Sequence, residues 1–260
     1  MVFVPHWYKL HHGTGVALRI FVNDILLYRH SGRDNWTFSG PANHLFAPGE
    51  NTLRVELFPT IAPAHAPKLR GPVEVRIMAD APEDVIIAQY DFSWWDAQNE
   101  PPLPSVGVSV FRPDGEIPEP AWQGAPRERF GPEGTPELRA AAQALHEAFA
   151  KRDVDAYFEA HRVRLEQWQR AYPESPAYDP SFQRARLADA MKIDWVMPPF
   201  DADALVFEPQ ADGRVAYVTR VDGGKALQAT AATREPTGTQ KTMESDLYLT
   251  RVDGVYRVFR

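Results

Sequence analysis

The sequence predicts two domains of different classes, an all-β sandwich over residues 1–112 and an α+β domain over residues 135–260. Three observations predict this division. Apolar and polar residues alternate in the first half, apolar residues recur at helical spacing from residue 135, and nine of the 24 prolines fall between Pro101 and Pro136. A chain of 260 residues is also long for a single hydrophobic core.

Alternating apolar residues predict the strands of the first half. Val16, Leu18, Ile20 and Val22 share one face, and the same pattern recurs over 52–57, 73–77, 85–94 and 106–111. A period of two gives each strand one buried face, and the Gly, Pro and Asn residues between the runs predict turns. Short strands in this order favour a sandwich.

Two segments of this half resemble the jelly-roll accessory domains of β-galactosidase-type glycoside hydrolases. They are FVNDILL at 21–27 and APGENTLRVEL at 47–57. In that family a strand-Asn-strand hairpin precedes a Pro-Gly-x-Asn-x-Leu turn. The resemblance implies a jelly-roll-like sandwich, and it carries over no sugar-binding residue.

Four aromatic residues of the first half allow two interpretations. Trp36, Phe38, Trp94 and Trp95 could stack on sugar rings, which would make this domain a carbohydrate-binding module. Large aromatic side chains are more often buried, so packing in a core or an interface is the favoured interpretation. Trp94 and Trp95 are adjacent and would point to opposite faces of a strand.

The histidines of the first half do not predict a metal site. His6, His11 and His12 lie close together in the sequence, and His30, His44 and His65 are scattered. A metal needs two or three converging histidines, usually with carboxylates, and adjacent histidines on a strand diverge. We expect these side chains to be solvated in loops.

A proline-rich segment, 113–134, is predicted to link the two domains. Its prolines exclude a central strand or a helix interior and make the segment semi-rigid. Trp122 and Phe130 lie within it, and two large aromatic residues in a linker indicate that it packs along a domain surface.

Three helices are predicted next, over 136–151, 154–172 and 180–191, with Pro173 ending the second. Thr135, Asp153 and Asp179 precede them as N-caps, and proline opens the first and third. The buried face of the second helix is predicted from a continuous stripe, made up of Val154, Tyr157, Phe158, His161, Leu165, Trp168 and Tyr172. Strands are predicted over 205–207, 215–221, 226–234, 242–251 and 255–259.

Helices followed by an antiparallel meander indicate an α+β fold. The segments KRDVDAY at 151–157 and LTRVDGVYRV at 249–258 resemble the nuclear transport factor 2-like (SnoaL-like) superfamily. The resemblance implies a cone of three helices packed on a curved antiparallel sheet. The superfamily includes isomerases, dehydratases, polyketide cyclases, assembly domains, transport adaptors and bacterial immunity proteins, so the fold does not choose a function.

The interior of this cone is the candidate site for a ligand or a reaction. Enzymes of the superfamily use an Asp or an Asp/His pair there, and His161 is the best catalytic candidate because it lies on the same stripe as Tyr157 and Trp168. A buried histidine beside a carboxylate can act as a general base. Arg220, Glu244 and Asp246 are its possible partners on the strands. Ligand binding without chemistry, and plain packing, remain as alternatives.

The last strands suggest a second kind of site. Tyr217, Tyr248, Arg251, Tyr256 and Arg257 alternate along them, and Tyr and Arg are typical anchors of protein interfaces. In the superfamily the outer face of this sheet is commonly where a partner or a second subunit docks, which makes homodimerisation through the C-terminal sheet possible.

The amino-acid composition limits the kinds of function that the protein can have. A net charge of −7 and a pI of about 5.6 argue against nucleic-acid binding and suit a basic protein partner. No cysteine is present, so thiol catalysis and cysteine-ligated zinc are excluded. No motif calls for a cofactor. No apolar run reaches the ~18 residues of a membrane span, and no signal peptide is recognisable, so a cytoplasmic protein is expected.

Together these observations favour a noncatalytic bacterial protein that binds another protein, as an immunity protein or an adaptor does. The alternatives are a small-ligand-binding protein or an isomerase- or cyclase-type enzyme that uses the cone, and a carbohydrate-binding module.

Overall fold

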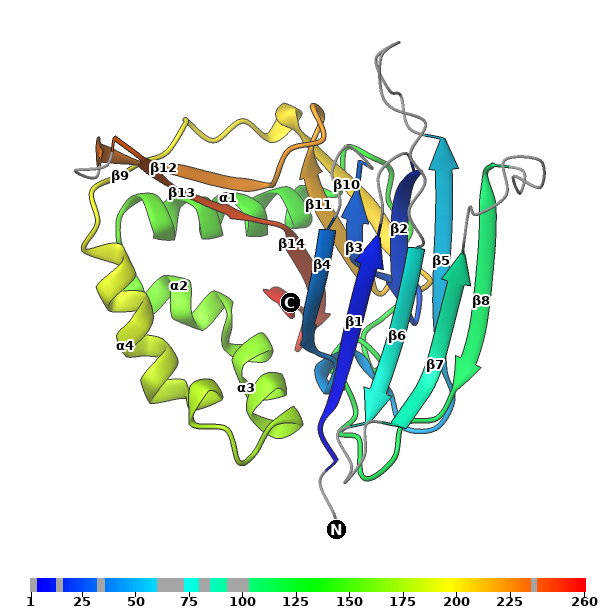
Figure 1. Cartoon of the computed structure of the whole chain (residues 1–260). Coiled ribbons are helices and arrows are strands. Elements are labelled where there is room, and N and C mark those ends of the chain that lie inside the picture. Colours follow the sequence, from blue (N-terminus) through cyan, green and yellow to red (C-terminus); the bar gives the residue numbers. More distant parts are fainter. Residues whose placement is uncertain are drawn as a thin grey trace. The chain divides into compact units, whose positions relative to one another are not determined.

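The computed structural model describes residues 4–12, 16–31, 36–59, 73–79, 85–92, 103–234 and 238–260. It divides into two compact units, residues 1–120 and 121–260. The described strands form four antiparallel sheets, two in each unit (Figure 1). No helix in the described ranges has the length and apolar character needed to span a membrane.

The N-terminal unit consists of two four-stranded sheets, ordered β4-β1-β6-β7 and β3-β2-β5-β8. Each run of alternating residues falls on a strand, although the segment 93–94 of one prediction lies outside the described residues. The strands are β1 (His6–His12), β2 (Val16–Val22), β3 (Ile25–His30), β4 (Trp36–Pro41), β5 (Asn51–Pro59), β6 (Val73–Ala79), β7 (Val85–Phe92) and β8 (Ser105–Phe111).

Alternation buries one face of each central strand of this unit. Leu18 pairs with Leu57 and Ile20 with Val55 across β2 and β5, and these four side chains are buried. The opposite face of β2 and β5 carries charges instead, and the Arg19 Nε lies 3.0 Å from a carboxylate oxygen of Glu56. Apolar burial is therefore concentrated between the two sheets.

The turn before β5 explains the Pro-Gly-x-Asn pattern. Gly49 has a φ of +87°, a conformation that side chains with a Cβ rarely adopt. The buried Asn51 accepts a hydrogen bond from the Ala47 N–H at 2.8 Å and donates one to the Ala47 carbonyl at 2.9 Å. The glycine and the asparagine thus have a structural role, as predicted.

The prediction that the histidines of the first half are solvated in loops was wrong for three of them. His6 and His12 are fully buried on β1, and His44 is buried in a short 3-10 helix, η1 (Asn43–Leu45). β1 alternates like its neighbours, and its inward residues are His6, Tyr8, Leu10 and His12. Histidine rings, which usually face solvent, therefore fill space in the core at two positions of this strand. Burial lowers the pKa of His6, and burial, with the nearby His30 and His11, lowers the pKa of His12 to about 4.

The aromatic residues of the same half are partly accessible. Trp36 and Phe38 lie on β4 and are 49% and 40% exposed, and Phe38 packs at 5.7 Å from Tyr8, between ring centroids. Trp94, Trp95 and His65 lie outside the described residues. The core packing favoured for Trp36 and Phe38 is therefore incomplete.

The C-terminal unit combines four α-helices with two sheets, ordered β10-β11-β14-β15 and β13-β12-β9. Figure 1 shows α1 running alongside β12 and β13. The helices are α1 (Pro136–Ala150), α2 (Val154–Ala160), α3 (Arg162–Ala171) and α4 (Pro180–Met191), with 3-10 turns η2 (Pro176–Tyr178) and η3 (Ala202–Ala204). The strands are β9 (Trp195–Val196), β10 (Leu205–Gln210), β11 (Val215–Arg220), β12 (Leu227–Arg234), β13 (Gln240–Ser245), β14 (Leu247–Val252) and β15 (Val255–Val258).

The predicted caps begin three of these helices. The Thr135 hydroxyl accepts the Leu138 N–H, the Asp153 carboxylate accepts the Ala156 N–H, and the Asp179 carboxylate accepts the N–H groups of Ser181 and Phe182. The buried face of α1 carries Leu138, Ala142 and Leu145, which pack with strand residues in one core.

The single helix predicted over 154–172 is wrong, because it breaks at His161. This residue has φ −95° and ψ 1°, and its Nδ1 lies 2.9 Å from the Tyr157 carbonyl oxygen, which also accepts the His161 N–H. A side chain that enters the hydrogen-bond ladder bends a helix. As a result α3 buries Val163, Gln167 and Ala171, while Leu165 and Trp168 of the predicted stripe are only partly buried.

The strand predicted over 242–251 is also divided. β13 and β14 belong to different sheets, and Asp246 lies between them. The Asp246 carboxylate accepts a hydrogen bond from the Tyr217 hydroxyl at 3.0 Å and pairs with Lys225. The chain changes sheets at this polar residue, which periodicity alone does not mark.

The second part of the predicted linker packs along the C-terminal unit, as its aromatic residues suggested. Phe130 packs against the core of this unit, and Trp122 is buried. The Glu128 N–H donates to the Gly213 carbonyl at 3.1 Å, and the Phe207 N–H donates to the Pro132 carbonyl at 2.9 Å. Backbone hydrogen bonds thus fix residues 128–132 to β10 and to the turn that follows it.

Candidate functional site

A hollow of about 550 Å³ opens among the helices of the C-terminal unit, and we call it the helical pocket. Its walls come from α2, α3, η2, α4 and β13. The residues that line it are Tyr157, Phe158, His161, Arg164, Leu165, Trp168, Tyr178, Gln183, Arg186, Leu187 and Met243. The volume lies within the usual range of small-molecule sites.

Two pairs of aromatic rings form part of this wall. The centroids of Trp168 and Tyr178 are 4.8 Å apart, and those of Tyr157 and His161 are 4.3 Å apart. Leu187, Met243 and Tyr157 also pack against the small core cluster around Phe149. The wall is therefore held by packing on both sides and offers flat apolar surfaces to the hollow.

His161 contributes a neutral acceptor to the helical pocket. Its side chain is buried, with 7% exposed. Because the carbonyl oxygen of Tyr157 can only accept, Nδ1 carries the ring proton, and Nε2 is left without a hydrogen-bond partner among the described residues. Burial first, and then the charge of Arg164, lower the pKa of His161 to about 3.

Arg164 contributes a cation without a carboxylate. Its guanidinium carbon lies 5.6 Å from the Trp168 ring centroid, and none of the described residues forms an ion pair or a hydrogen bond with the guanidinium. Burial, with the charge of Arg260, lowers the pKa of Arg164. Arg186 is exposed at the same pocket, and no Asp or Glu is among the described residues that line it.

Two neighbouring arginines take up the nearby acids. Arg162 pairs with Glu159 and Glu166, and Arg184 pairs with Asp155. Acids are therefore close in the sequence, but they are bound to other arginines. The helical pocket is locally positive in a chain whose net charge is −7.

The structure brings together only part of the predicted cone site. Tyr157, His161 and Trp168 line the helical pocket, whereas Arg220 and Glu244 do not. Arg220 lies 3.5 Å from Asp222, and Glu244 is exposed beside Met243, because successive residues of a strand face opposite ways. Arg164, Tyr178 and Met243 were not predicted, although Arg164 lies one helical turn from both His161 and Trp168.

General-base chemistry finds little support in this geometry. A base is efficient when its pKa lies near the working pH, and burial keeps the pKa of His161 at about 3. The predicted carboxylate partner is also missing from the described lining. The arrangement suits recognition by hydrogen bonding, charge and stacking.

The predicted partner-binding residues are engaged within the C-terminal unit. Tyr217 and Tyr248 are buried, with their ring centroids 4.8 Å apart. Glu128 binds Arg251 at 2.9 Å and also accepts the hydroxyl of Tyr256, whose pKa is raised by burial and by this carboxylate. Arg257 lies 3.2 Å from Glu159.

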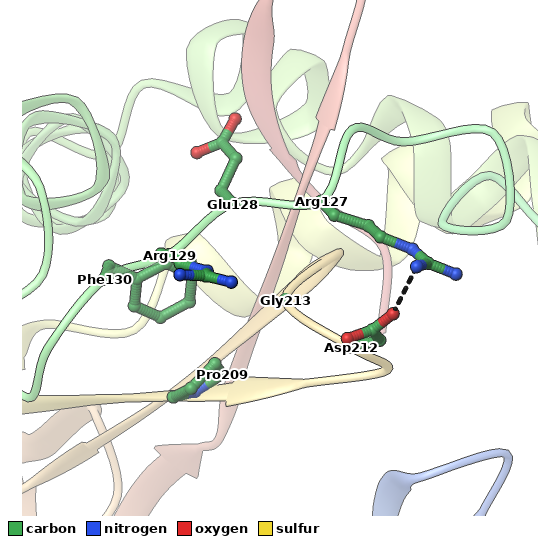
Figure 2. A pocket seen from close by; sticks show the side chains of 7 residues that line it. All are labelled: Arg127, Glu128, Arg129, Phe130, Pro209, Asp212 and Gly213. Atoms are coloured by element: carbon green, nitrogen blue, oxygen red, sulfur yellow. Dashed lines mark ion pairs between the residues drawn. The ribbon is translucent and has the colours of Figure 1, made fainter.

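A second hollow, of about 510 Å³, lies along the linker (Figure 2). It is lined by Arg127, Glu128, Arg129, Phe130, Pro209, Asp212 and Gly213. Figure 2 shows Arg127 directed at Asp212, with 2.9 Å between their charged atoms, while the Glu128 carboxylate points away from this pair. Both acids of this hollow are therefore already paired.

Among the described residues, no group of three or more His, Asp or Glu side chains is placed to hold a metal ion. Comparison with models of known protein families, with curated proteins and with solved structures gives no significant match.

Proposed function

We propose that this protein binds a small organic molecule in the helical pocket of its C-terminal unit. The observation that carries the proposal is an aromatic lining that includes two polar groups without a hydrogen-bond or ion-pair partner among the described residues, the Arg164 guanidinium and Nε2 of His161. Buried polar groups are normally hydrogen-bonded. A ligand that supplies these bonds would remove the cost of leaving them unmade.

The proposal also assigns a fold to each of the two units. Four antiparallel sheets in two compact units suit a jelly-roll-like sandwich and a nuclear transport factor 2-like cone. In such a cone, a hollow between helices and a strand is a natural binding place, and the helical pocket is bounded by α2, α3, α4 and β13.

Binding to another protein, as an immunity protein or an adaptor, is the less supported alternative. Its five candidate anchors are buried or bonded within their own unit, so a partner would have to replace contacts that already exist. Catalysis in the cone is less supported because His161 lacks a carboxylate. The carbohydrate-binding alternative depends on aromatic residues of which only Trp36 and Phe38 are described.

The experiment is a thermal-shift screen of the whole protein with neutral, cationic and anionic small molecules. A compound present at 100 times its Kd stabilises the folded state by about 2.7 kcal/mol, which raises Tm by several degrees. Leu187→Trp should abolish the shift, because the larger ring fills the helical pocket. Val196→Trp is the control, since Val196 is 58% exposed on β9 and does not line the pocket.

The proposal fails if no compound in any charge class raises Tm, or if Leu187→Trp leaves the shift unchanged. In either case the helical pocket is a packing defect rather than a site.

A further inference from the structure

We infer that the ligand is a small aromatic carboxylate, with its carboxylate on Arg164 and its ring against Trp168 and Tyr178. This inference rests on the proposed function of the helical pocket, and it names the chemical class that the pocket selects. Three features of the lining support it. They are the charge of Arg164, the aromatic rings beside it and the hydrogen-bond acceptor of His161.

The charge of the lining points to an anion. A cation taken out of water is costly unless a negative group compensates it. Arg139, Arg152, Arg162 and Arg184 each have a carboxylate partner, whereas Arg164 has none among the described residues. Since no Asp or Glu occurs in the described lining, an organic cation would find no counter-charge there, and an anion would meet no repulsion.

The geometry of the cation points to a carboxylate with a single charge. A guanidinium presents two parallel N–H groups, which match the two oxygens of a carboxylate. Arg164 is half-buried in the lining, whereas Arg186 is exposed. One half-buried positive charge neutralises one negative charge, so a doubly charged phosphate would keep part of its charge uncompensated.

The remaining wall points to an aromatic body. The Trp168 ring centroid is 5.6 Å from the Arg164 guanidinium carbon and 4.8 Å from the Tyr178 ring centroid, so a ring attached to the carboxylate has aromatic surfaces close to it. Leu165, Leu187 and Met243 supply apolar contacts around it. A volume of about 550 Å³ has room for one or two rings.

His161 adds a preference within this class. Its Nε2 can accept a hydrogen bond, so a hydroxyl or an N–H group on the ligand ring should strengthen binding. Burial lowers the pKa of His161 to about 3, so the ring is neutral near pH 7. The acceptor is therefore present from pH 5 to pH 8.

The test uses isothermal titration calorimetry of the full chain with three matched probes. These are 4-hydroxycinnamate, its uncharged amide and the amine tyramine. We expect the acid to bind about 10- to 100-fold more tightly than the amide, which is the range of a charge-assisted hydrogen bond, and tyramine to bind weakest. Removing the ring hydroxyl, as in cinnamate, should weaken binding about three- to tenfold.

Two substitutions test whether Arg164 binds the carboxylate of the ligand. Arg164→Gln should reduce the affinity for 4-hydroxycinnamate at least tenfold and remove the difference between acid and amide. Arg170→Gln is the matched control, because it deletes an exposed cation of the same helix that does not line the helical pocket, and it should change the affinity less than threefold. The comparison of acid with amide on the unaltered protein gives the same answer if Arg164→Gln does not fold.

The outcomes separate the inference from the proposed function. Binding of the amide or of tyramine as tightly as the acid, abolished by Leu187→Trp, would keep the helical pocket as a ligand site and overturn the carboxylate assignment. Equal loss of affinity in Arg164→Gln and Arg170→Gln would also overturn it. If no small molecule of any charge binds, the proposed function itself is lost.

Discussion

Replacing Gly213 with alanine should detach the linker from the C-terminal unit. Gly213 has a φ of +79°, and a Cβ at this position would lie 2.2 Å from the carbonyl oxygen of Glu128. Backbone atoms cannot avoid this contact by changing a rotamer. The segment around Glu128 must therefore move away, and its hydrogen bond to the Gly213 carbonyl is broken.

The expected loss of stability has two parts. Alanine in a left-handed conformation costs roughly 1–2 kcal/mol wherever it occurs. The backbone hydrogen bond from Glu128 to Gly213 adds about 1 kcal/mol. The partly buried hydrogen bond that Glu128 accepts from the Tyr256 hydroxyl adds about 1 kcal/mol more, because it depends on the position of the same segment. The total is about 3–4 kcal/mol.

Gly254 provides a matched control. It also has a φ of +79°, but a Cβ there would have no neighbour within 4 Å. Gly254→Ala should therefore show only the conformational cost. We would measure urea unfolding of both variants of the full chain, together with hydrogen exchange of the Glu128 amide. Gly213→Ala should be about 2 kcal/mol less stable than Gly254→Ala, and only Gly213→Ala should lose protection at Glu128. Equal losses in the two variants, with Glu128 still protected, would refute the reasoning.

Three further outcomes can be checked by urea unfolding. Leu138→Ala should cost about 2–5 kcal/mol, because this side chain is fully buried in the C-terminal core; a cost under about 1 kcal/mol would place it outside that core. Asn51→Ala should cost about 2–3 kcal/mol, because it leaves the buried Ala47 N–H without its acceptor, and an unchanged midpoint would mean that water replaces the amide. Acidification from pH 7 to pH 5 should destabilise the C-terminal unit by about 2 kcal/mol through His161, since the unfolded chain takes up a proton near pH 6.5 that the folded state excludes down to a pKa of about 3. His161→Gln should flatten this dependence, and an equally steep pH profile in that variant would assign the effect to other groups.

The strands of the sandwich were predictable because alternation and burial agree there. β2, β5 and β6 each carry apolar residues on one face, so their positions follow from the period of two. β1 escaped prediction because its inward face carries His6 and His12 beside Leu10. A histidine ring counts as polar in a pattern, yet neutral rings with lowered pKa values fill the core at these positions.

The helical pocket was predictable only in part, for a similar reason. The stripe from Val154 to Tyr172 contains Tyr157, His161 and Trp168, which line the pocket, but it is as continuous as that of an unbroken helix. The break depends on a hydrogen bond from the His161 side chain, and a residue type does not reveal which bond it makes. Arg164 lies off the stripe, and a charged residue in such a position is typical of a solvated face. Tyr178 reaches the pocket from a 3-10 turn, which has no period to detect.

The break at His161 bears on the balance between stability and the proposed binding. An unbroken helix would keep Leu165 and Trp168 on one continuous stripe, whereas both residues are only partly buried here. The protein instead leaves part of a tryptophan uncovered and holds an uncompensated guanidinium beside it. Sites that need such features are commonly less stable than they could be. A library of variants at 161, 164 and 168 sorted only for heat resistance should therefore lose ligand binding, and one sorted for binding should keep the fragile arrangement.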